Sequence, residues 1–164
     1  IRTTDAVSGM PHVVCTIEDA QALVGTEVGV SDWVLIDQAR INLFADATDD
    51  HQWIHVDPDR AARDLPIGST IAHGYLTLAL IPALIDNFVE FVGLERIINY
   101  GINKARFKAM VPAGSRVRLR AVLDSARKRA GALQMILKCT VEVEGQTKPA
   151  CVVETIGMYF LAGV

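Results

Sequence analysis

The chain has 164 residues, of which 51% are hydrophobic and 21% charged, and its 16 basic and 19 acidic side chains give a net charge of −3. This composition excludes an intrinsically disordered chain and a low-complexity fibre, and the length predicts one domain over residues 1–164. The slight acidic excess argues against nucleic acid as a partner, because nucleic-acid-binding proteins usually carry a basic excess or stripe.

Cysteine usage and hydropathy indicate a cytoplasmic protein. The three cysteines, Cys15, Cys139 and Cys151, form no CxxC pair and have no spacing typical of a disulfide framework. The longest strongly apolar stretch lies around residues 78–85 and is well short of the ~20 residues that span a bilayer. We therefore expect no membrane span.

The N-terminal half of the chain predicts short helices joined by loops. Residues 1–15 contribute little to any pattern and are expected to form a poorly ordered N-terminal extension. The predicted elements are a helix over 17–24 capped by Thr16, a strand over 33–36, a helix over 38–47 capped by Asp37, and a short helix over 59–63 opened by Asp57 and Pro58.

The longest predicted helix runs from Gly74 to about Phe91. Its residues are apolar on nearly every side, which indicates a buried helix rather than a surface one. Pro82 lies inside it and removes one backbone hydrogen bond, so we expect a kink near residues 78–82.

After Gly93 the hydrophobic pattern changes to a period of two, which is typical of strands. Residues 115–123 alternate between apolar and basic side chains, residues 133–143 alternate in the same way, and residues 151–161 form a third strand candidate. Shorter strands are predicted over 96–99 and 105–108. One apolar and one charged face indicate an antiparallel sheet with one side in water. The sequence therefore predicts an α+β fold, a curved antiparallel sheet wrapped around one central helix.

Titratable residues gather directly before the apolar helix. Three of the four histidines, His51, His55 and His73, lie between positions 51 and 73, beside Asp49 and Asp50. A carboxylate and an imidazole that share one water form an acid/base pair. Such residues next to the most apolar segment indicate a site.

The pair His73-Gly74 lies where the long helix is predicted to begin. The first N–H groups of a helix have no internal partner, and the helix dipole favours negative charge there. Gly74 has no side chain, so a ligand oxygen can approach its N–H closely. This is the geometry of an oxyanion hole.

The run FADATDDHQWIHVDP over residues 44–58, followed by IAHGYL over residues 71–76, resembles the hydratase-2 motif of MaoC-like dehydratases, the (R)-specific enoyl-CoA hydratases. The branch similar to nodulation protein N looks closest. The resemblance is dense over residues 41–80 and looser over residues 106–114. It implies a hot-dog fold, a homodimer, and a lyase of fatty acid metabolism that hydrates trans-2-enoyl thioesters to (R)-3-hydroxyacyl thioesters.

The resemblance also implies residue roles. The catalytic Asp and His of the family, five residues apart, correspond to Asp50 and His55, and the oxyanion donor corresponds to the N–H of Gly74. Two departures are visible: the residue before the catalytic Asp is commonly Gly and is Asp49 here, and Gln52-Trp53 replaces the usual Asn-Pro. No metal or redox cofactor is expected, because the substrate itself carries coenzyme A or the pantetheine of a carrier protein.

Four neighbours of these groups are expected to bind substrate: Gln52, Trp53, His73 and Tyr75. For three of them a simpler role stays open, which is solvent exposure for Gln52, core packing for Trp53 and orientation of the loop for His73.

Several alternatives remain at the level of the sequence. A metal site on His51 and His55 lacks a third ligand at convincing spacing. A basic stripe on the predicted strands either binds a phosphate of the substrate carrier or is a solvated sheet face; it consists of Lys104, Arg106, Lys108, Arg116, Arg118 and Arg120. The same fold also serves acyl-CoA thioesterases and non-catalytic acyl-thioester-binding subunits.

Overall fold

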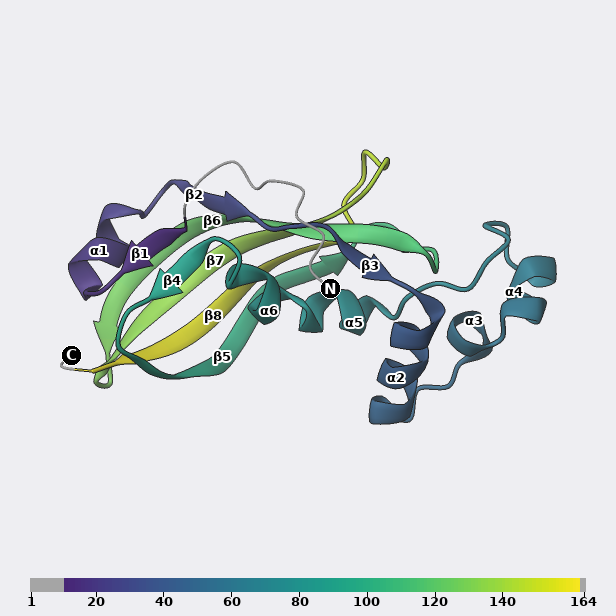
Figure 1. The fold of residues 1–164 in the computed structure, drawn as a ribbon, viewed down its shortest axis with the longest axis horizontal. Helices are drawn as coiled ribbons and strands as arrows, with labels where there is room; N and C mark the ends of the chain where they lie inside the picture. Colours follow the sequence, from purple (N-terminus) through teal and green to yellow (C-terminus); the bar gives the residue numbers. More distant parts are fainter. Residues whose placement is uncertain (1–10, 163–164) are drawn as a thin grey trace.

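A curved antiparallel sheet wraps around a central helical segment in the computed structural model, which describes residues 11–162 (Figure 1). The six strands of the sheet are β2 (Glu27–Val30), β3 (Val34–Ile36), β5 (Leu94–Phe107), β6 (Ser115–Arg129), β7 (Ala132–Val143) and β8 (Cys151–Leu161). Their order is β2-β6-β7-β8-β5, and β3 also pairs with β6. The predicted α+β class is confirmed.

Alternation along the long strands fixes which face of the sheet is buried. Leu119 on β6 pairs with Val141 on β7, Ala121 pairs with Cys139, and all four side chains are at most 2% exposed. Because side chains of a strand point alternately to opposite faces, the arginines of β6 face solvent. The predicted wet and dry faces are confirmed.

The central helix is shorter than predicted and is broken in two. α5 (Gly74–Ala79) and α6 (Ile81–Ile85) are separated by Leu80, two residues before Pro82, within the range where the kink is expected. The helix ends at Ile85 rather than near Phe91, because Phe88 N–H donates to the carbonyl of Ile85 in a tight turn. β4 (Val89–Phe91) follows this turn.

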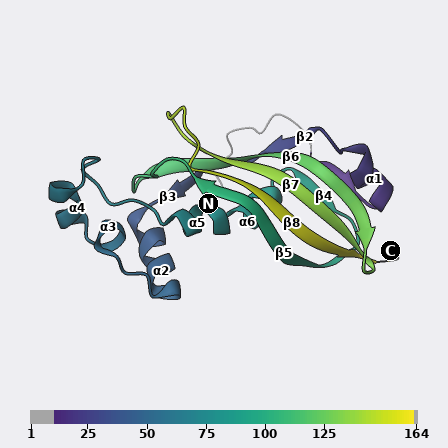
Figure 2. The same ribbon diagram turned by 180° about the vertical axis from the view of Figure 1, so that it is seen from behind.

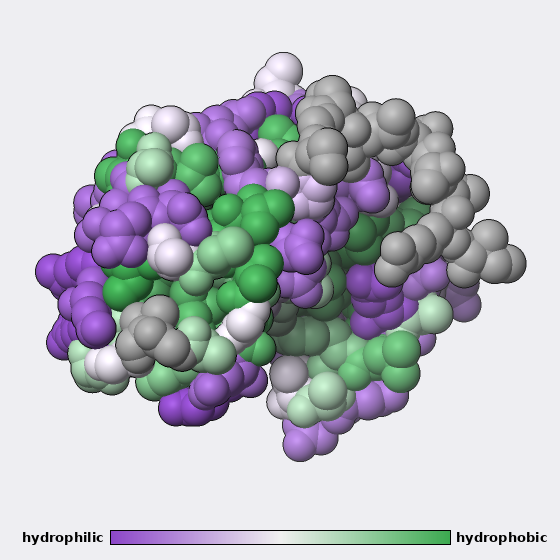
Figure 3. Space-filling view, turned by 60° about the vertical axis from the view of Figure 1, so that its left-hand side comes forward, coloured by the Kyte–Doolittle hydropathy of each residue, from purple (hydrophilic) through white to green (hydrophobic). Residues whose placement is uncertain are grey.

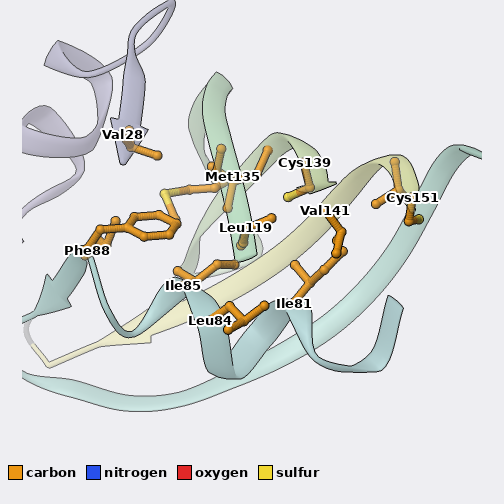
Figure 4. Close-up of a cluster of buried hydrophobic side chains, with 14 of the residues drawn as sticks. Val28, Ile81, Leu84, Ile85, Phe88, Leu119, Met135, Cys139, Val141 and Cys151 are labelled. Atoms are coloured by element: carbon orange, nitrogen blue, oxygen red, sulfur yellow. The ribbon is translucent and has the colours of Figure 1, made fainter. Parts of the chain in front are cut away.

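One side of the central segment packs into the sheet and the other does not. Figure 4 shows Ile81, Leu84 and Ile85 of α6 among core side chains of the sheet such as Leu119 and Met135. On the opposite side the apolar residues Ala79, Pro82 and Ala83 are exposed, and Tyr75 is 68% exposed. The expectation that the central helix is buried on nearly every side is therefore wrong for a single copy of the protein, because the sheet covers only one side of the helices.

The remaining elements lie at the two ends of the sheet (Figures 1 and 2). They are β1 (His12–Val14), which pairs with β4, and α1 (Ile17–Ala22) at one end, and α2 (Gln38–Thr48), α3 (Trp53–Val56) and α4 (Pro58–Asp64) at the other. Of the expected extension, residues 1–10 lie outside the described residues, whereas residues 12–14 form β1. The two short strands expected over 96–99 and 105–108 are one continuous strand, β5. Across residues 11–162, no helix combines the length and the apolar character that a membrane crossing requires.

Candidate active site

Three segments bring the predicted site residues together. Asp50 follows the end of α2, His55 lies on the single-turn helix α3, and the loop after α4 leads through His73 into α5. Asp49 ends α2 with φ 57°, in the left-handed region that favours Gly and, among other residues, Asp and Asn. This backbone requirement explains why the departure from Gly to Asp at this position is tolerated.

His55 is held as a neutral imidazole with a free acceptor. The residue is 7% exposed, and its Nδ1 lies 2.6 Å from the carbonyl oxygen of Ile71. Since a carbonyl only accepts, Nδ1 carries the proton and Nε2 presents a lone pair. Burial, the largest effect, lowers the pKa of His55 from its usual value, and the hydrogen bond to the Ile71 carbonyl opposes it; the smaller effects of His73, which lowers the pKa, and of Asp50, which raises it, follow.

The carboxylate of Asp50 lies close enough to His55 to share a water with it. One ligand atom from each of Asp50, His55 and His73 lies within 4.8 Å of the other two. Two acceptors on one water lie roughly 4.5 Å apart, since each hydrogen bond spans about 2.8 Å. The Asp50 side chain is 52% exposed, so solvent reaches this position directly.

His73 supports the other two residues from behind. Its ring stacks on His55 with centroids 3.7 Å apart, and its Nε2–H donates to the main-chain carbonyl of Asp50 at 2.9 Å. It is 2% exposed, and its Nδ1 is buried without a hydrogen-bond partner among the described residues. This placement favours orientation of the loop over direct contact with substrate.

The three ligand atoms do not form a good metal site. The rings of His55 and His73 lie at 23° to each other, so their in-plane lone pairs run side by side rather than toward one ion. Main-chain carbonyls already occupy one nitrogen of each ring. His51 and His55, the alternative metal ligands considered from the sequence, do not point to a shared site. His51 is exposed, and its Nε2 contacts Asp46 Oδ1 at 2.9 Å.

Gly74 begins α5 and faces the same cavity as His55. The cavity holds about 360 Å³ and is lined by both residues together with Thr77, Phe107 and Lys108. No acceptor among the described residues takes the N–H of Gly74. A Cβ built on Gly74 would come within 2.9 Å of the Phe107 ring, so only glycine fits here without displacement of that ring. Asp50 is not among the described residues that line the cavity.

The other predicted substrate contacts lie around this centre. Gln52 is exposed, and Trp53 is half-buried with the Arg60 guanidinium 4.1 Å from its ring centroid. Tyr75 is exposed and meets Phe107 edge to face, with ring centroids 5.6 Å apart. Tyr75 thereby touches a side chain that lines the cavity.

Most of the predicted basic stripe is engaged in ion pairs on the outer face of the sheet. Arg118 and Arg120 both contact Glu142, which lowers the pKa of that carboxyl against the opposing effect of its partial burial. Arg116 pairs with Glu144, and Lys104 pairs with Glu154. These pairs favour the interpretation of a solvated sheet face over a phosphate site.

Gln38 and Thr70 are polar residues of the site that the sequence pattern misses. Gln38 Nε2–H donates to the main-chain carbonyl of His55 at 2.7 Å, and the hydroxyl of Thr70 donates to Gln38 Oε1. The contacts join residues 17 and 32 positions apart, so no local motif reveals them.

Comparison with known proteins points to one family. Residues 19–145 match the family model described as MaoC like domain. The chain is 53% identical over 145 residues to 3-hydroxyacyl-thioester dehydratase Z of Mycobacterium tuberculosis, which covers 88% of this chain and 95% of that protein. It is 49% identical over 142 residues to nodulation protein N of Rhizobium meliloti, with 82% and 85% covered.

A solved structure shares the fold. The (R)-hydratase from A. caviae involved in PHA biosynthesis superposes with a TM-score of 0.67 at 22% identity, covering 82% of this chain and 94% of that one. The likeness confirms the predicted hot-dog arrangement.

Proposed function

We propose that this chain, which belongs to the family of MaoC-like dehydratases and is therefore a hydro-lyase, adds water reversibly to trans-2-enoyl thioesters. The products of this addition are (R)-3-hydroxyacyl thioesters. One observation carries the proposal: His55, whose Nε2 lone pair is free, and Gly74, whose N–H has no acceptor among the described residues, line one cavity, and a carboxylate oxygen of Asp50 lies within 4.8 Å of a ring nitrogen of His55. A water acceptor and an oxyanion donor on the two sides of one ligand are what hydration of a conjugated thioester needs.

The proposed reaction begins with one water between the dyad members. The Asp50 carboxylate accepts one hydrogen of that water, and His55 Nε2 removes the other proton while the oxygen bonds to C3 of the enoyl group. The π electrons of the C2=C3 bond move toward the thioester carbonyl, whose oxygen gains negative charge and accepts a hydrogen bond from Gly74 N–H. This step gives an enolate and a protonated His55.

The second step returns the proton. As the enolate collapses, C2 takes the proton from the His55 imidazolium on the face where water attacked, so the addition is syn. One O–H bond of water and the π bond between C2 and C3 break, one C–O and one C–H bond form, and the thioester is unchanged. Since each step is a proton transfer or a nucleophilic addition, the proposed reaction uses neither a metal nor a redox cofactor.

A second, mostly apolar cavity accommodates the acyl chain in this proposal. It holds about 310 Å³ between the central helices and the inner faces of β5 and β8, and Leu78, Ile81, Ile102 and Tyr159 are among its lining residues. Consecutive residues of α5 line the two cavities, Thr77 the first and Leu78 the second. Figure 3 shows hydrophobic side chains around a hollow in one side of the molecule.

The proposed active form is a homodimer. β5 is the edge strand of the sheet and runs for 14 residues with an almost wholly exposed burial pattern, including Ile98, Tyr100 and Ile102 at 47–57% exposure. A long edge with unpaired backbone groups and large apolar side chains is a template for pairing with another strand. A second copy joined at β5 also covers the exposed apolar side of α5 and α6.

A cytoplasmic location completes the proposal. Cys15, Cys139 and Cys151 are all free, and burial raises the pKa of the Cys139 thiol to about 11. Two buried free thiols fit a reducing compartment.

The reaction is tested by following two signals from crotonyl-CoA at once. We expect loss of the absorbance of the conjugated enoyl group without release of free thiol, and chiral analysis should identify (R)-3-hydroxybutyryl-CoA. Thiol release with an intact enoyl group would instead identify a thioesterase. Saturable binding of enoyl-CoAs of every chain length without turnover would identify a non-catalytic acyl-thioester-binding subunit.

A further inference from the structure

We propose that Gln38 is a positioning residue that fixes the His55 imidazole relative to the Gly74 amide by tying α3 to the loop before α5; this inference rests on the proposed function. Gln38 is the first residue of α2 and is half-buried. Its amide group offers both donors and an acceptor, so one side chain can hold two segments at once.

The contacts of Gln38 reach both segments that carry the chemistry. Nε2–H donates to the main-chain carbonyl of His55 at 2.7 Å and to Asn42 Oδ1 at 2.8 Å, while Oε1 accepts from the Thr70 hydroxyl. Thr70 is 2% exposed and lies four residues before Gly74. Gln38 therefore forms a bridge that connects His55, which accepts the proton in the proposed reaction, to Thr70, at the start of the segment that supplies the Gly74 amide.

α3 needs such an external support because it has little stability of its own. It is one turn long, and its N-cap residue Gln52 makes no side-chain capping bond. Isolated helices of this length do not persist in water, because one hydrogen bond cannot offset the ordering of a whole turn. The position of His55 therefore depends on what α3 binds.

The loop before α5 is held more firmly on its other side. The Thr70 carbonyl accepts from Ala113 N–H at 2.9 Å, and Ala72 N–H donates to the Val111 carbonyl at 2.8 Å, which fastens the loop to the segment leading into β6. Ile71 of this anchored loop also bonds α3 directly, since its carbonyl accepts from His55 Nδ1–H and its N–H donates to the Ile54 carbonyl at 3.0 Å. Gln38 adds a second connection beside this one, so loss of the bridge should let His55 shift within its remaining contacts while Gly74 stays in place.

The bridge acts on the reacting geometry rather than on substrate contact. Gln38 and Thr70 are not among the described residues that line the cavity of His55 and Gly74. A displacement of about 1 Å between catalytic groups and the reacting atoms can cost about 100-fold in rate. We therefore expect the bridge to affect kcat far more than KM.

Matched substitutions in the full-length protein test this inference. Gln38→Met keeps the volume and removes all three hydrogen bonds of the amide group, and Thr70→Val keeps the shape and removes the hydroxyl, whereas Thr70→Ser retains it. The control is Gln21→Met on α1, where Gln21 Nε2–H likewise donates to a main-chain carbonyl, that of Ala126 at 3.3 Å. Crotonyl-CoA hydration gives kcat, KM and the pH profile, and thermal unfolding gives Tm.

We expect Gln38→Met and Thr70→Val each to lower kcat by about 10- to 100-fold, with KM within about two-fold and the acid limb of the pH profile in place. The double variant should be no slower than the slower of the two single variants, because both substitutions break the same bridge. Thr70→Ser should restore most of kcat, and Gln21→Met should change Tm alone.

Two results would overturn the inference while leaving the proposed function intact. One is a kcat of Gln38→Met and Thr70→Val, measured below their Tm, that equals that of Gln21→Met. The other is a shift of the acid limb, which would mean that Gln38 acts on the proton affinity of His55 rather than on its position. A wild-type protein without hydration activity would instead refute the proposed function.

Discussion

His55 shows how the environment of one residue fixes its chemistry. The Ile71 carbonyl selects the tautomer, and burial lowers the pKa, so the imidazole stays neutral to a lower pH than a free histidine does. Since the neutral form is the acceptor, activity is present above this lowered pKa and is lost as the pH falls through it.

The pH profile of wild-type kcat/KM on crotonyl-CoA checks this directly. We expect an acid limb whose midpoint lies below the ordinary histidine value of about 6.5. The limb should persist in His51→Gln, because His51 lies on the surface and its pKa is raised, mainly by its hydrogen bond to Asp46. A midpoint above the ordinary value, or a limb that disappears with His51, would show that another group is titrating.

The Gly74 amide can be removed without removing the start of α5. Gly74→Pro deletes the N–H at the first helical position, where proline is well tolerated, and His73 already has the extended ψ of 137° that a residue before proline adopts. Gly74→Ala is the matched control, because it adds a Cβ against Phe107 and keeps the N–H.

We expect kcat of Gly74→Pro to fall about 100-fold or more below that of Gly74→Ala, the usual cost of one oxyanion donor. Steady-state kinetics on crotonyl-CoA, with circular dichroism to verify folding, measures the difference. Equal rates of the two folded variants would mean that the amide does not stabilise the developing charge.

Among the helices and strands, features that depend only on residues close together in the sequence can be predicted from the sequence. Thr16 and Asp37 cap α1 and α2 as the sequence indicates, because a cap needs only a side chain and the next turn. Asp50, His55 and Gly74 are found through a motif of fixed spacing, and the structure brings Asp50 to His55 and seats Gly74 on the cavity of His55.

Long-range contacts decide what the pattern misses. β5 is one strand rather than two because β8 pairs with it along its whole length, across register shifts that interrupt the alternation. The bridge from Gln38 to Thr70 is invisible in the sequence for the same reason, since its partners are 32 positions apart. The end of the helix at Ile85 depends on the turn that brings β4 beside β1.

The exposed edge of β5 leads to a prediction about assembly. Ile102→Asp places a charge in the apolar surface that a second copy would cover, so we expect it to shift the protein from dimer to monomer. Leu43→Asp is the control, because Leu43 is 70% exposed on α2, away from β5. Analytical ultracentrifugation distinguishes the two states. A wild-type monomer at micromolar concentration, or an Ile102→Asp dimer, would contradict pairing through this strand.

The molecule as a whole combines a rigid frame with a site built on short pieces. The long strands β5 to β8 and the two central helices form the core, whereas the dyad lies on the end of α2 and on α3, outside the sheet (Figure 2). The central segment connects the two regions, since α5 begins at the site and α6 packs in the core. The sheet and the central helices thus fix the position of the Gly74 N–H. The short helices α2 and α3 bring Asp50 and His55, the proposed acid/base groups, to the same region.

The chain contains its own control for the proposed catalytic dyad of Asp50 and His55. Asp46 and His51 have the same five-residue spacing as Asp50 and His55, but they pair directly on the surface. The most direct measurement is therefore kcat of crotonyl-CoA hydration for Asp50→Asn and His55→Gln beside Asp46→Asn and His51→Gln. We expect the first two to lose about 100- to 10,000-fold and the second two to keep the wild-type rate. Wild-type rates in folded Asp50→Asn and His55→Gln would show that these two side chains do not carry the reaction.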